Sequence, residues 1–185
     1  MVFIEIQNLH RLEKEHKWEQ AISLLKHKWE QDKNNTNIML RLASKCWYIM
    51  SNWDFLDLDD SNLDFNSIQS ILIETYDIFL KSNTVNNNAL AMFGYMVSLF
   101  PNYFYTDYDL DGKIFLQYEN RGKDMLKSAC SNEPKNKLYK ALYLGLNNNL
   151  DKVVIEAKKD VNNVVQQLFP HDTKIEEYFK DVLTK

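Results

Sequence analysis

Apolar residues recur at helical spacing along most of the chain. Between positions 18 and 29 they follow the i, i+3, i+4, i+7 spacing of a single helical face, at Trp18, Ala21, Ile22, Leu25 and Trp29. Similar spacing predicts helices over residues 38–50, 67–80, 137–146, 151–169 and 174–183. Two more are predicted, one from Asn86 to the residue before Pro101 and one from the end of the following loop to about Ser131.

The pattern therefore predicts an all-α fold of about nine helices. The connections are mostly about 3–8 residues long, which is typical of helical bundles and helical-repeat proteins. Only 4 glycines and 3 prolines occur in 185 residues, too few for the many tight turns of an all-β domain. We expect residues 1–185 to form a single helical domain, since this length is usual for one.

Two segments resemble the helices of a tetratricopeptide repeat. The small, large, small and proline residues typical of its second helix and closing turn are present at Gly122, Leu126, Ala129 and Pro134. The spacing of its first helix is present at Leu90, Phe93, Gly94 and Val97. The resemblance implies an irregular, tetratricopeptide-like stack of antiparallel helical hairpins, in which small residues let two helices approach closely. An ordinary irregular helical bundle is the alternative.

Charge is distributed unevenly along the chain. The formal net charge is −4, but residues 51–120 carry eleven acidic and only two basic side chains. Such a region repels nucleic acid and attracts a basic protein partner. The alternative is a solvated acidic face that keeps the protein in solution.

Aromatic residues stand beside acidic ones in two predicted loops, within residues 51–66 and 102–111. Aromatic side chains supply buried area at protein interfaces, and carboxylates supply selection and steering. We predict that these loops bind a partner protein through Trp53, Asp54, Phe55, Asp57, Asp59, Asp60, Asp64, Tyr105, Asp107, Tyr108, Asp109 and Asp111. The alternative is that most of the rings belong to the core and the acids to ordinary loop surface.

Residues 88–145 also resemble the small helical immunity proteins of bacterial toxin systems, such as those of contact-dependent growth inhibition. The resemblance rests on the runs 93–104, 122–129 and 132–136, with Tyr139 after them. It implies an antitoxin that binds the C-terminal domain of a cognate toxin, often a nuclease, and blocks it. We expect a cytoplasmic, monomeric protein that forms a 1:1 complex. A generic tetratricopeptide-like adaptor that grips a peptide or helix in a concave groove is the alternative, and a helical enzyme is a third.

One loop resembles a metal site. Asp107, Asp109, Asp111 and Gly112 match the first half of an EF-hand calcium loop, but Tyr118 stands where the bidentate carboxylate should be. We therefore expect no metal and no other cofactor, although the sequence leaves open whether this loop binds a cation.

Other functional classes lack sequence signals. The four histidines form no zinc motif, and no nucleophile stands in a recognisable catalytic pattern, so we expect no enzymatic activity. The basic residues are scattered, so we expect no nucleic-acid partner. The longest apolar run has 12 residues, at 89–100, so we expect no membrane insertion. Cys46 and Cys130 are read as small core residues of a reducing compartment.

Overall fold

The computed structural model describes residues 2–56, 58, 63–82, 85–146, 152–171 and 173–184. Within these ranges the chain forms ten α-helices, two short 3₁₀ helices and no β-strand, so the predicted all-α class is confirmed. The α-helices are α1 (Leu9–Lys14), α2 (Trp18–Gln31), α3 (Thr36–Ser51), α4 (Phe65–Lys81), α5 (Asn87–Leu99), α6 (Lys113–Asn132), α7 (Lys137–Gly145), α8 (Lys152–Asn162), α9 (Val165–Leu168) and α10 (Lys174–Thr184). The 3₁₀ helices are η1 (Trp53–Leu56) and η2 (Pro101–Phe104).

Asparagine and aspartate side chains cap the N-termini of four helices. Asn35, Asp64, Asn86 and Asn136 each accept a hydrogen bond from a backbone N–H in the first turn of α3, α4, α5 and α7, respectively. These bonds satisfy N–H groups that have no partner inside the helix. Asn35, Asn86 and Asn136 therefore have a local structural role.

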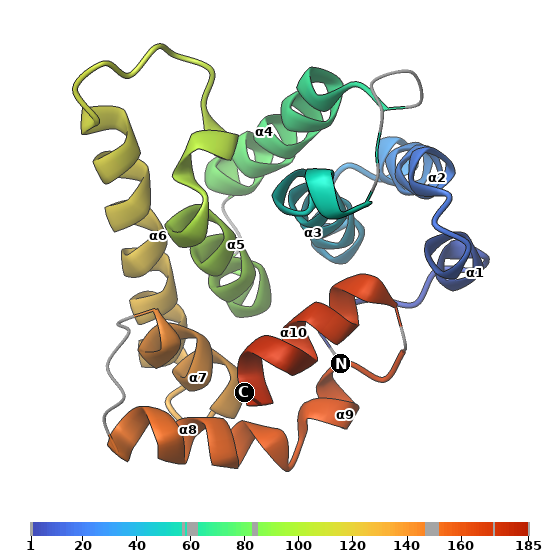
Figure 1. Cartoon of the computed structure of the whole chain (residues 1–185). Helices are drawn as coiled ribbons and strands as arrows, with labels where there is room; N and C mark the ends of the chain where they lie inside the picture. Colours follow the sequence, from blue (N-terminus) through green and yellow to red (C-terminus); the bar gives the residue numbers. More distant parts are fainter. Residues whose placement is uncertain are drawn as a thin grey trace.

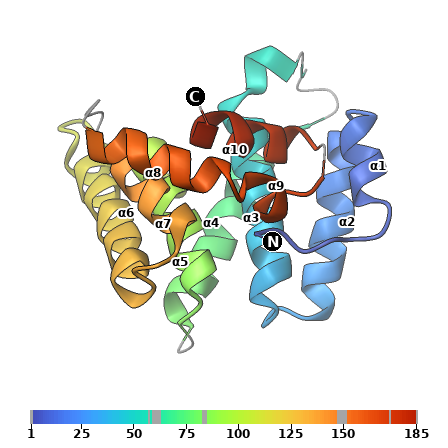
Figure 2. The same ribbon diagram turned by 90° about the horizontal axis from the view of Figure 1, so that it is seen from below.

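Successive helices pack side by side through most of the chain (Figure 1). α2, α3 and α4 run in alternating directions, and α5 and α6 form a second antiparallel pair. The helices α8, α9 and α10 close one side of this array (Figure 2). The two ends of the chain meet there, since the backbone N–H of Val2 donates to the carbonyl of Leu168 at 2.9 Å.

The helix α3 lies at the centre of the core. Every residue from Met39 to Met50 is buried, so no side of the helix faces water over these three turns. The C-terminal helix α10 packs on α3 through aromatic rings: the ring of Trp47 lies 5.5 Å from that of Tyr178 and 6.5 Å from that of Phe179. The core joins both ends of the sequence around α3.

Two glycines bring α5 and α6 into backbone contact. A Cβ atom on Gly94 would lie 2.9 Å from the carbonyl oxygen of Gly122, and one on Gly122 would lie 2.5 Å from the hydroxyl of Ser98. Neither position has room for a side chain. The predicted role of small residues at these two positions, close approach of antiparallel helices, is therefore confirmed.

Some boundaries differ from the expectation. The short helix α1 was not predicted, and the expected helix over 151–169 is divided into α8 and α9 by a turn at Asn163 and Val164. Cys46 is buried as expected, whereas Cys130 is only half-buried.

Candidate partner-binding site

The loop between η2 and α6 is braced by one of its own carboxylates. Asp109 accepts hydrogen bonds from the backbone N–H groups of Ile114 at 3.1 Å and Phe115 at 2.7 Å, at the start of α6. The hydroxyl of Tyr105 donates to the same carboxylate at 3.4 Å. Desolvation acts to raise the pKa of Asp109, but the N–H donors outweigh it and lower this pKa below its usual value. Asp109 is thus committed to holding the loop against α6.

Large side chains project from this braced loop. Tyr108 is 87% exposed and Leu110 is 84% exposed, values unusual for residues of this size. Phe115 and Leu116, in the first turn of α6, add further exposed apolar surface. The loop extends from one corner of the molecule beyond the end of α6 (Figure 1). A loop that is hydrogen-bonded to a helix and exposes apolar side chains has the form of a binding surface.

The EF-hand resemblance of this loop has a structural explanation. The oxygens of Asp109 accept from α6, and Asp111 accepts from the backbone N–H of Lys113 and pairs with its ammonium group. Gly112 precedes α6 with a φ of 69°, a left-handed conformation that favours glycine. Among the described residues, no three His, Cys, Asp or Glu side chains are grouped so that they could hold a metal ion.

The other predicted loop is described only in part. Asp57, Asp59 and Asp60 lie outside the described residues. Phe55 is 88% exposed on η1, and Asp54 beside it is exposed. Asp64 caps α4 by accepting from the backbone N–H of Ser67 at 2.8 Å, so its role is local.

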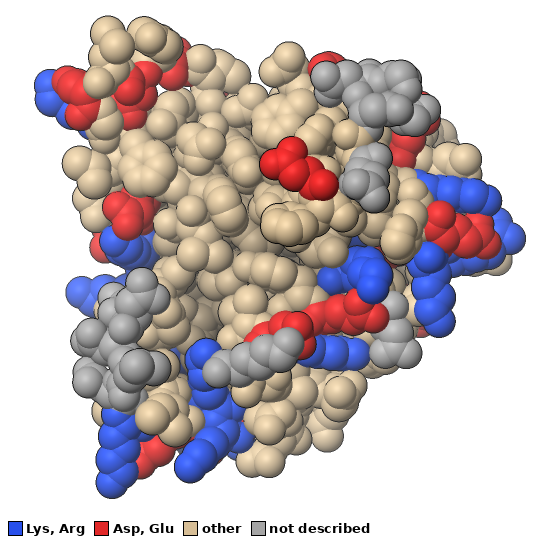
Figure 3. Space-filling model, viewed as in Figure 1, with Lys and Arg blue, Asp and Glu red and all other residues tan. Residues whose placement is uncertain are grey.

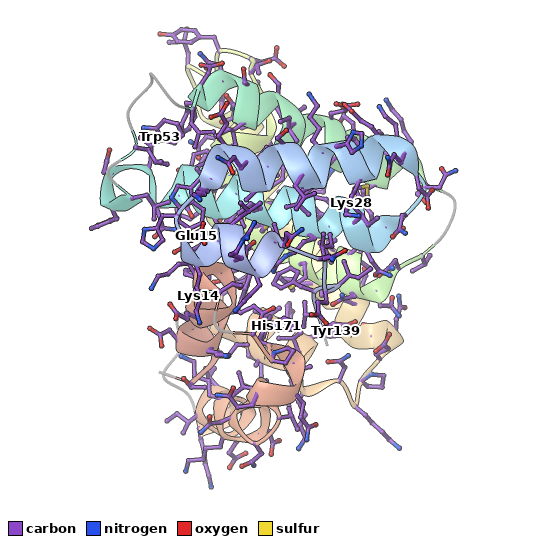
Figure 4. All side chains as sticks on the ribbon, turned by 90° about the vertical axis from the view of Figure 1, so that its right-hand side faces the viewer. Lys14, Glu15, Lys28, Trp53, Tyr139 and His171 are labelled. Carbon is purple, nitrogen blue, oxygen red and sulfur yellow. The ribbon has the colours of Figure 1, made fainter. Side chains whose placement is uncertain are left out.

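Trp53 is half-buried, and its ring packs against another ring of the molecule. Its ring packs edge-on against Phe65 at 5.2 Å, and Phe65 packs in turn against Tyr103 at 6.1 Å. These contacts place η1 beside η2 at the start of α4. Figure 4 shows Trp53 at the edge of the molecule, in the 3₁₀ turn to which it belongs. For Trp53, the core interpretation is closer to the structure than the interface one.

The predicted site residues that the structure describes do not form one continuous surface. η1 and the loop before α6 lie apart in both Figure 1 and Figure 2. On the face drawn in Figure 3, acidic side chains form separate groups divided by uncharged surface, one of them over the loop before α6. Several basic side chains lie on the lower left part of this face, separated by uncharged surface. On this face, the described acidic side chains are therefore spread over several local sites.

A groove that the sequence did not predict runs along α4. One face of the helix forms its floor, with Ser70, Ile73, Glu74, Asp77, Ile78 and Lys81. The opposite wall is formed by residues 104–107, at the end of η2 and just after it, and by Tyr118 of α6. The volume of the groove is about 660 Å³. The i, i+3, i+4 spacing of the floor residues is visible in the sequence, but the wall that turns this face into a groove comes from distant segments.

A buried ionic cluster joins α1, α3 and the C-terminal region. The carboxylate of Glu13 accepts from Arg41 at 2.9 and 3.1 Å, and the ammonium of Lys45 lies 2.8 Å from it. Glu176 approaches the other side of Arg41 at 3.9 Å and accepts from the backbone N–H of His171 at 2.6 Å. His171 lies between α1 and the C-terminal helices (Figure 4). The side chains of Glu13, Arg41, Lys45 and Glu176 are all at most 3% exposed.

Burial controls the protonation of this cluster. Desolvation lowers the pKa of Lys45 to about 8, although the nearby carboxylate of Glu13 acts in the opposite direction. Desolvation likewise raises the pKa of Glu176. A lysine with a depressed pKa is common in active sites. The Lys45 side chain is 0% exposed, so a substrate in solution has no access to it in this structure, and its contacts are those of a structural group.

No protein-family model matches the sequence, and comparisons with curated proteins and with solved structures find no match. Among the described residues, none of the helices combines the length and the apolar character needed to cross a membrane.

Proposed function

We propose that this protein is an immunity protein that binds and neutralises a cognate toxin domain, one that is basic and cleaves nucleic acid. The observation that carries the proposal is the braced loop before α6. It presents Tyr108 and Leu110 to solvent with Asp107 and Asp111 on either side. Rigid apolar side chains flanked by carboxylates suit a partner surface that is apolar at its centre and basic at its rim.

The proposed mechanism is competitive. A nuclease binds phosphates through Lys and Arg side chains in its cleft, and carboxylates from this loop would occupy the same positions. Burial of Tyr108 and Leu110 would slow dissociation, because most differences in affinity between related complexes lie in the off-rate. The bracing of the loop by Asp109 reduces the ordering cost of binding. The proposal places the protein in the cytoplasm as the monomeric partner in a 1:1 complex.

Phe55 on η1 is the second contact in this proposal. It is as exposed as Tyr108, and Asp54 stands beside it. Because η1 and the loop before α6 lie apart, a partner that touched both would have to cover the surface between them. That requirement favours a folded domain over a short peptide.

The test is rescue of growth. The proposal predicts a neighbouring gene that encodes a large secreted protein with a basic C-terminal domain, and this domain would be expressed in a bacterial host with and without the present protein. Rescue by the wild-type chain is expected, together with loss of rescue in the double variant Tyr108→Ala and Leu110→Ala. The matched control is Val153→Ala with Ile155→Ala, which removes exposed apolar side chains from α8. Equal rescue by both folded double variants would rule out the loop as the contact.

A tetratricopeptide-like adaptor is the second candidate, and the groove along α4 favours it. An adaptor would bind a peptide or a partner helix in this groove without neutralising a toxin. The two functions differ in the growth assay, because only an immunity protein rescues growth.

A further inference from the structure

The groove along α4 contains two acidic side chains that lack a basic partner. Within the described part of the chain, no Lys or Arg nitrogen forms an ion pair with Asp77 or Asp107. Two nearby carboxylates are paired: Glu74, which also lines the groove, with Lys33 at 2.9 Å, and the half-buried Glu119 with Lys123 at 2.6 Å. Asp77 and Asp107 line the groove without such a partner among the described residues and can pair with a cationic group of a ligand.

The other charged side chains in and beside the groove are Lys81, the pair of Glu74 and Lys33, and Arg121. Lys81 lines one end of it, and Lys33 reaches Glu74 from the turn between α2 and α3. The guanidinium of Arg121 lies 5.7 Å from the ring centroid of Tyr118. Of the four charged residues that line the groove, three are acidic and one is basic. A ligand with one or two positive charges complements this lining.

Aromatic rings form much of the wall. The ring centroids of Tyr105 and Tyr118 lie 5.2 Å apart, and both residues line the groove. Aromatic faces attract cations, and a planar guanidinium stacks on them more effectively than an ammonium does. Carboxylates accept two parallel hydrogen bonds from a guanidinium. Arginine satisfies both features of this lining, the rings and the free carboxylates.

The dimensions of the groove fit a short peptide segment. The floor extends from Ser70 to Lys81 along α4, about 16 Å at 1.5 Å per residue. Five extended residues cover about the same length at roughly 3.3 Å each. Between the charged positions, Ile73 and Ile78 provide an apolar floor for the side chains in between.

We propose that the groove between α4, residues 104–107 and α6 binds an extended, arginine-containing segment of the partner protein. This proposal depends on one part of the proposed function, namely that the chain binds a protein partner. The groove is a second contact, separate from Tyr108 and Leu110, and the side chain of the partner that it recognises is arginine.

The test is a titration of the full-length protein with three synthetic pentapeptides, acetylated and amidated at their ends. Their sequences alternate leucine with arginine, with lysine or with glutamate. Amide shifts in nuclear magnetic resonance spectra are expected at residues 70–81, 104–107 and 118 with the arginine peptide. The lysine peptide should bind more weakly, and the glutamate peptide should cause no shifts. Shifts located elsewhere, or equal binding of the glutamate peptide, would overturn the assignment.

A charge-reversed variant tests the role of the unpaired carboxylate. Asp77→Lys should weaken binding of the arginine peptide about tenfold, since it places a positive charge in the groove. The matched control is Glu156→Lys, the same kind of reversal at an exposed position on α8, which should change the affinity less than about twofold. Equal affinities for the two folded variants would contradict the proposal.

The growth assay separates this assignment from the proposed function. If Asp77→Lys rescues growth as well as the wild type does, and also binds the arginine peptide equally well, the groove is not the contact and the immunity function stands. If the peptide binds in the groove but the wild-type chain rescues no growth, the groove assignment stands and the immunity function is wrong.

Discussion

The two sides of the core use charge in opposite ways. Around α1, α3 and α10, four ionisable side chains are enclosed in the interior, centred on Glu13 and Arg41. Around α5 and α6, the interior is a close contact between Gly94 and Gly122, and the charges lie outside on the connecting loop and on α4. One side encloses its charged residues in the interior, and the other leaves them on the surface.

This difference has an energetic basis. Burying an ion pair costs the hydration free energy of both ions, and their mutual attraction offsets this cost only when the geometry is good. Such a cluster therefore adds little net stability, but removing one of its members is strongly destabilising. Exposed carboxylates retain their hydration, and changing them leaves the fold almost unaffected. Substitutions within the cluster should therefore act on folding, and substitutions on the loop and groove should act on binding.

The largest effect is expected from Glu13→Gln. This change keeps the shape of the side chain but leaves the buried Arg41 and Lys45 without their shared carboxylate. We expect the free energy of unfolding to fall by about 3–5 kcal/mol, measured by urea denaturation. Glu15→Gln is the control, because Glu15 lies one residue beyond the end of the same helix and pairs with Lys17 in solvent. Similar losses for the two variants would show that the buried cluster is not a distinct structural unit.

The pH dependence of stability should identify Lys45 within the cluster. Its pKa in the folded protein is about 8, below the ordinary value of 10.5, so the unfolded chain binds more protons between these limits. Stability from this group is therefore reduced at neutral pH and rises with pH through this range. Between pH 7.5 and 9.5 we expect the wild type to gain about 2 kcal/mol relative to Lys45→Met. The comparison of the two proteins cancels the contribution of the tyrosines. Parallel pH curves for the two would contradict the depressed pKa.

On the other side of the core, Gly122→Ala should break the contact between α5 and α6. A Cβ atom there would lie 2.7 Å from the backbone nitrogen of Ser98, which can move only with the helix. We expect a loss of about 1–3 kcal/mol in thermal or urea unfolding. Gly145→Ala is the control, because a Cβ atom on Gly145 would meet nothing within 4 Å. If both variants unfold like the wild type, the glycine contact is not what joins these helices.

The sequence predicted the helices well because their apolar residues have a clear period. In the helix predicted over residues 67–80, helical spacing places Ile68, Ile71, Leu72 and Tyr76 on one face; Ile68, Leu72 and Tyr76 are buried in α4, and Ile71 is half-buried. Gly94 and Gly122 were expected to permit close helix packing, and they contact one another. These features depend on local spacing, and local spacing is visible in one sequence.

The ionic cluster and the groove were missed because their parts are distant in sequence. Arg41 is separated from Glu13 by 28 residues, and Glu176 comes from the last helix. The sequence did contain one signal. Apolar residues of α3 lie on every side of the helix, which indicates a buried helix. A charged side chain in a buried helix needs a partner of opposite charge. The identity of that partner depends on tertiary structure. The spread of acidic residues over separate local sites has the same origin.

The smallest effect on folding is expected in the exposed loop, and it separates the two kinds of residue there. Tyr108→Ser removes a side chain that is 87% exposed, so the melting temperature should not change. Asp109→Ala removes the acceptor for two backbone N–H groups of α6 and should lower the melting temperature by a few degrees. In the growth assay the order should be different: Tyr108→Ser should impair rescue directly, and Asp109→Ala should impair it through the loss of loop order. If Tyr108→Ser impairs rescue without changing the melting temperature, the side chain of Tyr108 acts in binding and not in folding.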